Sequence, residues 1–304
     1  MMSREAPVWR SLLYVPANQE RFIVSAHTRG ADCIQLDLED SVPFDQKELA
    51  RAKVENAAAR VRRGGADVMV RINRPLSLAV RDIEACVGPD VDGFSLPKVE
   101  SASHIHLLDE LLSEVELKRG LEVGHSSLIA IVESAAAMFD ILAIARSSPR
   151  LVALNLGGED FALDCGMRPT ADTLHLPKQQ IVHAASAARL APLGVLGSIT
   201  GFKDEAAFQA MVQRSKEFGF VGASAIHPSQ VAILNKVFSP SDEEIAEAKR
   251  VITALEVAQA EGRGAVALDG RMIDAPVAAR ARKTLARRAA IDRRARRAES
   301  LGLH

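Results

Sequence analysis

The sequence predicts a (β/α)8 barrel followed by a helical extension. Eight short apolar runs of strand character recur between residues 11 and 226, and segments with helical periodicity connect them. The runs start about 30 residues apart on average, which is the spacing that a barrel of about 250 residues needs. A doubly wound open sheet alternates in the same way but uses fewer strands, so eight runs favour the barrel.

Eight runs supply the predicted strands. They are residues 11–15, 33–38, 67–72, 93–96, 128–132, 151–156, 193–197 and 222–226. The connecting segments place apolar residues on one helical face, as Leu108, Leu112 and Val115 do before the fifth run. Phe208 and Met211 repeat this spacing before the eighth run.

The sequence changes character after residue 238. A helix is predicted over residues 242–260, where Ser241 and Glu244 fit a capping box. Gly262 and Gly264 then interrupt the chain, and a short segment, residues 265–276, precedes a terminal helix rich in alanine and arginine. We therefore predict two domains, a barrel over residues 1–238 and a helical extension over residues 239–304.

Composition limits the classes of partner. The formal net charge of the 304 residues is −1, which gives no global reason to expect nucleic acid or a membrane surface as a partner. The basic terminal helix lacks interleaved aromatic residues, so a solvated or subunit-docked helix is favoured over a nucleic-acid-binding one. Three scattered cysteines, no secretory signal and no apolar run of bilayer length predict a cytoplasmic protein.

Two acids follow neighbouring predicted strands and form the candidate metal site. Glu133 comes directly after the fifth run, and Asp160 follows Gly157-Gly158 after the sixth, with a helix predicted over residues 134–146 between them. In a parallel barrel both acids reach the carboxyl edge of the strands, where such folds keep their chemistry. Two carboxylates that leave room for waters suit Mg²⁺.

Each acid also has a plainer explanation. Glu133 fits an acid at a helix N-terminus, favoured by the helix dipole. Asp160 fits a helix N-cap. The metal hypothesis is preferred because the two acids occur together, with two glycines that let the backbone approach closely.

Other polar groups follow successive predicted strands at the same end. Arg71 lies near the end of the third run, directly before Ile72, and its planar guanidinium is suited to clamp a substrate carboxylate. The second run ends in the segment Asp37-Leu38-Glu39-Asp40, and Asp40 is predicted to orient that guanidinium. The fourth run is followed by Pro97-Lys98, the seventh by Ser198 and the eighth by His227-Pro228.

Eight sequence blocks carry a family resemblance. They are RSLLYVPA (10–17), GADCIQLDLEDSV (30–42), VRINRP (70–75), SLPKVES (95–101), IVESAAA (131–137), LGGEDFALDCG (156–166), IHPSQV (226–231) and DGRMIDAPV (269–277). In order and across nearly the whole chain, they resemble the citrate lyase β-subunit-like branch of the HpcH/HpaI aldolase family. That branch includes malyl-CoA and citramalyl-CoA lyases.

The resemblance implies a barrel that binds Mg²⁺ and a CoA thioester and assembles as a homotrimer or hexamer. Glu133 and Asp160 match the metal-ligand positions, and Arg71 matches the substrate-binding arginine, with Asp40 in the acidic motif beside it. Asp274 matches an acid on a C-terminal lid, residues 265–276 here, which reaches the site of the adjacent subunit.

The resemblance also bears on CoA binding. Arg21 and Lys47 fall near positions that contact CoA in the family. No core residue of the motifs is missing from this sequence.

The resemblance implies retro-aldol cleavage of a 3-hydroxyacyl-CoA, such as malyl-CoA or citramalyl-CoA, to an acyl-CoA and a 2-oxo acid, or the reverse condensation. Two alternatives remain open: a malyl-CoA-type thioesterase and a citrate lyase β subunit acting on an acyl-carrier thioester. A non-catalytic metabolite-binding role is disfavoured because the motif acids and Arg71 are all present. The acyl group itself depends on pocket walls, which motifs do not reveal.

Overall fold

The structure is a computed structural model that describes residues 7–201 and 203–300. The chain divides into two compact units, Met1–Phe238 and Ser239–His304.

The first unit is built on eight parallel strands. They are β1 (Ser11–Pro16), β2 (Cys33–Asp37), β3 (Asp67–Arg71), β4 (Gly93–Leu96), β5 (Ser127–Val132), β6 (Leu151–Leu156), β7 (Ala191–Leu193) and β8 (Ala223–Ala225). Their order in the sheet is β7-β6-β5-β4-β3-β2-β1-β8, so each strand pairs with its neighbour in sequence and β1 pairs with β8. A parallel bridge between Leu193 and Gly222 joins β7 to the start of β8. The predicted (β/α)8 barrel is therefore confirmed.

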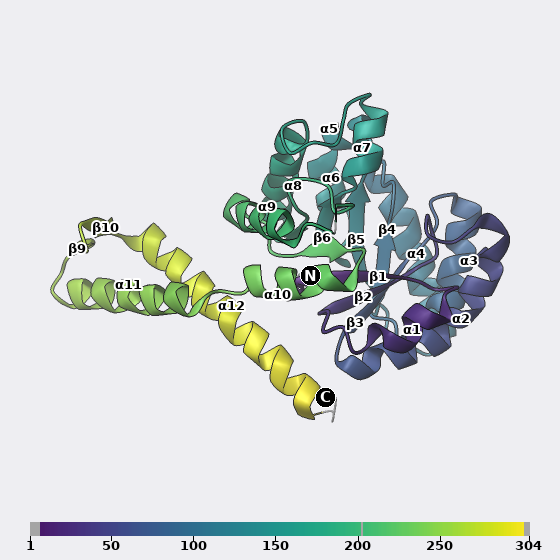
Figure 1. Cartoon of the computed structure of the whole chain (residues 1–304), viewed down its shortest axis with the longest axis horizontal. Helices are drawn as coiled ribbons and strands as arrows, with labels where there is room; N and C mark the ends of the chain where they lie inside the picture. The colour runs from purple at the N-terminus through teal and green to yellow at the C-terminus, as the bar shows by residue number, and fades with distance from the viewer. Residues whose placement is uncertain (1–6, 202, 301–304) are drawn as a thin grey trace. The chain divides into compact units, whose positions relative to one another are not determined.

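Helices follow the strands and lie around the sheet, as Figure 1 shows. They are α1 (Glu20–Ala26), α2 (Lys47–Val61), α3 (Leu76–Cys86), α4 (Ala102–Lys118), α5 (Ala135–Phe139), α6 (Ile141–Ala145), α7 (Gly158–Asp164), α8 (His175–Ala188), α9 (Glu205–Phe218) and α10 (Pro228–Val237), with 3-10 turns η1 (Phe44–Gln46) and η2 (Arg62–Gly64). This alternation of strand and helix brings the carboxyl ends of all eight strands to one mouth of the barrel.

The alternation of side chains along each strand divides the core into two layers. Leu12, Cys33 and Met69 belong to a cluster that fills the barrel interior. Their neighbours Leu13 and Ile34 belong to a larger cluster that packs the strands against the helices. Because successive strand residues point to opposite faces, an apolar run can be buried on both sides.

Two predicted elements differ from the structure. The single helix predicted over residues 134–146 is two short helices, α5 and α6, which meet at Asp140, where the backbone leaves the helical conformation. The seventh strand ends at Leu193, whereas the sequence predicted residues 193–197. The carbonyls of Val195 and Gly197 accept hydrogen bonds from the Lys178 ammonium, and they do not extend the sheet.

The second unit contains two helices and a hairpin. The predicted capping box of Ser241 and Glu244 is present at the start of α11 (Asp242–Ala260). Strands β9 (Val266–Leu268) and β10 (Arg271–Ile273) form an antiparallel pair within the predicted lid segment, before α12 (Ala275–Ser300). Asp269 and Gly270, both with positive φ, make the tight turn between these strands, as Asp-Gly pairs commonly do.

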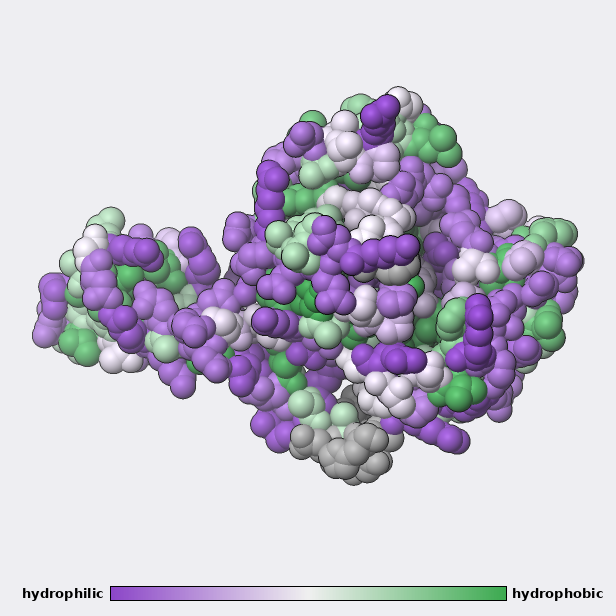
Figure 2. All heavy atoms as spheres, viewed as in Figure 1, coloured by the Kyte–Doolittle hydropathy of each residue, from purple (hydrophilic) through white to green (hydrophobic). Residues whose placement is uncertain are grey.

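Hydrophilic side chains predominate on the face in Figure 2, where apolar side chains form only scattered small groups. Within the described residues, no helix combines the length and the apolar character that crossing a bilayer requires.

Candidate active site

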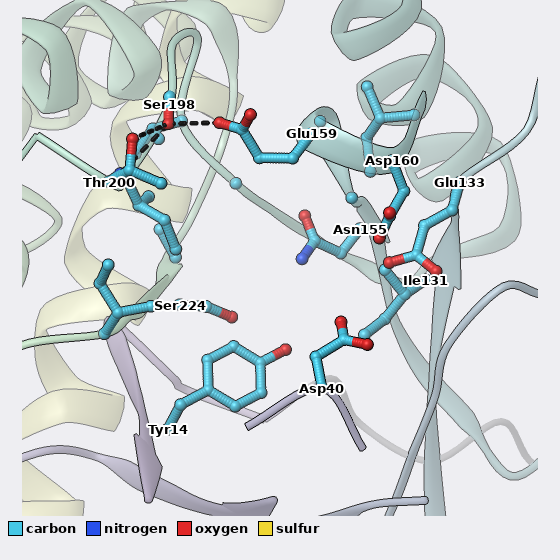
Figure 3. A pocket seen from close by; sticks show the side chains of 18 of the residues that line it. Tyr14, Asp40, Ile131, Glu133, Asn155, Glu159, Asp160, Ser198, Thr200 and Ser224 are labelled. Carbon is cyan, nitrogen blue, oxygen red and sulfur yellow. Dashed lines mark hydrogen bonds between the residues drawn. The ribbon is translucent and has the colours of Figure 1, made fainter. Parts of the chain in front are cut away.

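A cavity of about 490 Å³ lies at the carboxyl ends of the barrel strands. Residues from β1, β2, β3, β5, β6, β8 and α8 and from the segments after β2, β5, β6, β7 and β8 line it (Figure 3). The lining includes Tyr14, Asp37, Asp40, Arg71, Glu133, Asn155, Glu159, Asp160, Lys178, Ser198, Thr200 and Ser224. A concave site of this size with several convergent polar groups is typical of small-molecule binding.

The predicted acid pair lies together in this cavity. Glu133 follows β5 and is buried, whereas the side chain of Asp160, in the first turn of α7, is 41% exposed. Figure 3 shows the two carboxylates pointing toward one another. A Cβ at Gly157 would lie only 2.3 Å from Glu133 Oε1, so this glycine lets the backbone after β6 pass close to the carboxylate.

Burial and neighbouring acids raise the pKa of Glu133. Desolvation, and then repulsion from Glu39, raises the pKa of Glu133 to about 7. The peptide N–H of Lys98 donates to Glu133 Oε2 at 2.7 Å and fixes the carboxylate. A buried acid held next to a second acid is an environment that an added cation would stabilise.

The donor set fits a divalent ion that retains some of its water. Among the residues that the structure describes, no three or more His, Cys, Asp or Glu side chains form a candidate metal cage. Mg²⁺ is commonly held by one or two carboxylates and keeps several waters, which a substrate can displace. Glu133 and Asp160, open to the cavity, supply that arrangement.

Arg71 is held by Asp37 more tightly than by Asp40. Its Nε and Nη2 donate to the two carboxylate oxygens of Asp37, both at 2.7 Å, and Nη1 lies 3.0 Å from Glu39 Oε2. Asp40, predicted to orient the guanidinium, is largely exposed and lies 3.6 Å from Nη1. The strand register explains the difference, because Asp37 and Arg71 are direct partners on β2 and β3.

Arg71 and Asp37 form a buried ion pair, and both side chains stay charged. Although burial opposes ionisation, hydrogen bonds from Arg71 hold the pKa of Asp37 below its usual range. Below the guanidinium lies the ring of Tyr14, whose centroid is 4.6 Å from Cζ. Burial raises the pKa of Tyr14 to about 12, so its phenol stays protonated. Arg71 has five N–H donors, of which Asp37 accepts two, and Nη1 also lies near the carboxylates of Glu39 and Asp40.

The opposite wall carries hydroxyl groups. Ser198 Oγ donates to Glu159 Oε1 at 2.6 Å and lies 2.8 Å from Thr200 Oγ1 (Figure 3). Lys178, on α8, is buried. Its ammonium holds the segment after β7 against α8 by donating hydrogen bonds to the carbonyls of Val195 and Gly197. Burial lowers the pKa of Lys178 to about 8.

The other predicted site residues lie outside the cavity lining. Arg21, on α1, is exposed, with its guanidinium over the ring of Phe22. Lys47 begins α2, and its ammonium donates to the carbonyls of Leu38 and Glu39 at 2.8 and 3.0 Å. Their CoA-binding roles stay predictions.

Asp274 belongs to the second unit, directly before α12. Its Oδ1 accepts a hydrogen bond from the peptide N–H of Val277 at 3.1 Å, which caps the helix. Its role on a lid stays a prediction.

The fold and the site define a class of protein: a (β/α)8 barrel enzyme with an acid pair and a clamped arginine at the barrel mouth. The chain belongs to the HpcH/HpaI aldolase/citrate lyase family, whose sequence profile matches residues 10–228. This confirms the resemblance seen in the motifs.

Individual relatives match over most of the chain. Citrate lyase subunit beta of Leuconostoc mesenteroides subsp. cremoris is 35% identical, covering 91% of this chain and 92% of the relative. L-malyl-CoA/beta-methylmalyl-CoA lyase of Rhodobacter capsulatus is 34% identical, covering 87% and 90%. The crystal structure of CitE from Mycobacterium tuberculosis, in complex with magnesium, acetoacetate and coenzyme A, is 29% identical with a TM-score of 0.73, covering 95% of this chain and 100% of that one.

Proposed function

We propose that this protein is an Mg²⁺-dependent carbon–carbon lyase that cleaves a 3-hydroxyacyl-CoA thioester of the malyl-CoA type into an acyl-CoA and a 2-oxo acid. The observation that carries the proposal is the pair Glu133 and Asp160, which point toward one another in a cavity that Arg71 also lines. The relative named L-malyl-CoA/beta-methylmalyl-CoA lyase and the CitE complex with magnesium and coenzyme A support it.

The reaction breaks the bond between the hydroxyl-bearing carbon and the carbon next to the thioester. The hydroxyl loses its proton as it becomes the carbonyl of the 2-oxo acid, and the thioester enolate gains a proton to become the acyl-CoA. When bound, a divalent ion would acidify the hydroxyl and stabilise the forming 2-oxo acid. Glu133 and Asp160 would hold that ion at the barrel mouth.

Arg71 would stabilise negative charge in the reacting group. Its remaining N–H donors are fixed in place, because Asp37 holds the guanidinium through two hydrogen bonds. A preorganised donor of this kind supplies about 3–4 kcal/mol of transition-state stabilisation in a site that excludes water.

Asp274 would exchange the proton at the enolate carbon, as general acid or base according to direction. Its action on the site would come from a C-terminal lid shared between the subunits of a cytoplasmic homotrimer or hexamer. A lid would also exclude water and protect the enolate from premature protonation.

A second candidate is the β subunit of a citrate lyase, which would act on an acyl-carrier thioester. The 35% identity to citrate lyase subunit beta favours it. The two candidates differ in whether a free CoA thioester is sufficient as substrate.

The test is a condensation assay. Glyoxylate and pyruvate are each incubated with acetyl-CoA and propionyl-CoA in the presence of Mg²⁺, and the products are identified by mass spectrometry. The proposal predicts a hydroxyacyl-CoA product that requires Mg²⁺. Release of free thiol without a 2-oxo acid from the resulting thioester would instead identify a thioesterase, and activity only on a carrier thioester would identify the citrate lyase subunit.

A further inference from the structure

Lys98, which contacts both acids of the pair, has an unusual backbone conformation. It lies two residues after β4 and has φ 48°, in the left-handed region that side chains other than glycine seldom adopt. In this conformation its peptide N–H donates to Glu133 Oε2 at 2.7 Å. The backbone of Lys98 therefore orients one of the two proposed metal ligands, and strained conformations of this kind concentrate at functional sites.

The side chain of the same residue reaches the other acids. Its Nζ lies 2.6 Å from Glu39 Oε1, 3.7 Å from Asp40 Oδ1 and 3.9 Å from Asp160 Oδ2. Lys98 thus joins acids that follow β2 to the acid in α7, while its peptide N–H holds the acid that follows β5. Lys98 is absent from the cavity lining, so it would act through the acids and not on a substrate.

Glu39 fixes the ammonium in place. The carboxylate of Glu39 is buried between Arg71 Nη1, at 3.0 Å, and Lys98 Nζ. The contact with Glu39 at 2.6 Å, with Asp40 and Asp160 also within 4 Å, holds the ammonium at a defined place beside the acid pair.

The charges of this cluster are unbalanced. Its acids are Asp37, Glu39, Asp40, Glu133 and Asp160, and its cations are Arg71, Lys98 and Lys47, the last of which interacts with Asp37, Glu39 and Asp40. A divalent ion would offset the remaining negative charge, but it would sit close to the Lys98 ammonium and be repelled by it.

We propose that Lys98 is a positioning residue that sets the affinity of the acid pair for its divalent ion: its peptide N–H fixes Glu133, and its ammonium weakens the attraction of the cluster for the ion. This inference rests on the proposed function, because it takes Glu133 and Asp160 as the metal ligands. Lys98 thus orients Glu133 before the ion binds, and its positive charge lowers the affinity of the acids for the ion.

The test is a direct titration with Mn²⁺, followed by the electron paramagnetic resonance signal of the free ion. Lys98→Met removes the charge and keeps both the peptide N–H and the length of the side chain. Removing one positive charge a few ångströms from a divalent ion should tighten binding on the order of 10-fold. The difference should shrink as KCl is added, because salt screens charge interactions at a partly exposed site.

Matched variants separate charge from structure. Lys98→Arg keeps the charge and should bind Mn²⁺ as the wild type does, whereas Lys98→Gln should tighten binding as Lys98→Met does and serves if the Met variant does not fold. Lys118→Met removes the same charge from the far end of α4 and should change nothing.

The outcomes are distinguishable. If the wild type binds Mn²⁺ and Lys98→Met binds it equally or more weakly, the inference about Lys98 is overturned and the proposed function stands. If the wild type binds no Mn²⁺, or if Glu133→Gln binds it as well as the wild type, the metal site of the proposed function fails and this inference fails with it.

Discussion

Replacing Glu133 by glutamine should stabilise the metal-free protein while removing a ligand of the proposed metal site. Glu133 is only 7% exposed, and desolvation followed by repulsion from Glu39 raises its pKa from 4.5 to about 7. Glutamine has nearly the same shape, and its amide oxygen can still accept the hydrogen bond from the Lys98 peptide N–H. The variant therefore removes a disfavoured charge without opening a cavity.

The expected gain in the free energy of unfolding follows from the change in the pKa of Glu133. Each pKa unit between the folded and unfolded states corresponds to about 1.4 kcal/mol, so the rise from 4.5 to about 7 corresponds to about 3 kcal/mol. A carboxyl group with a raised folded-state pKa contributes stability at low pH and loses it as the pH rises through the folded-state value. The gain in the free energy of unfolding from Glu133→Gln should thus be near zero at pH 4.5 and reach its full value above pH 7.

The assay is urea unfolding of the metal-free protein at several pH values. Trp9, the single tryptophan of the chain, is buried in the barrel interior, so its fluorescence reports unfolding of this unit. Glu159→Gln, at an exposed acid of the same cavity, should change the free energy of unfolding by less than about 0.5 kcal/mol. A Glu133→Gln protein that is less stable than the wild type at pH 8, or equally stable there, would refute this reasoning.

Three further predictions concern the site. Asp160→Asn should abolish Mg²⁺-dependent turnover with an unchanged circular dichroism spectrum, and wild-type rates would contradict its role as a ligand. Arg71→Ala and Asp274→Ala should each be inactive, and mixed oligomers should recover part of the activity; the absence of rescue would place the lid within its own chain. Burial lowers the pKa of Lys178 to about 8 from 10.5, so its charge costs stability below pH 8 and this cost disappears as the pH rises toward 10.5. Urea unfolding should therefore show the wild type gaining stability relative to Lys178→Met between pH 8 and pH 10, and a constant difference would exclude this.

The barrel could be predicted because its signal is repeated eight times. Each apolar run is short, but the regular alternation of strand and helix leaves few folds that accommodate it. The hairpin of β9 and β10 was missed because its strands have three residues each. The Asp269-Gly270 pair, a common hairpin turn, was the available signal.

The acid pair could be predicted because position after a strand determines which edge of the barrel a residue reaches. The partner of Arg71 could not be chosen in this way, since Asp37 ends β2 and Asp40 follows three residues later. Only the register of β2 against β3 places Asp37 directly opposite Arg71. The proposed role of Lys98 could not be predicted from the sequence either, because it depends on a positive φ and on contacts with acids from three other parts of the barrel.

We expect Glu133 and Asp160 to share one divalent ion. Anomalous diffraction at the manganese absorption edge, from crystals soaked in Mn²⁺, would locate that ion. One peak is expected about 2.1 Å from an oxygen of each carboxylate, with water on the cavity side. A peak bound by only one of the two acids, or a peak held by other residues, would contradict it.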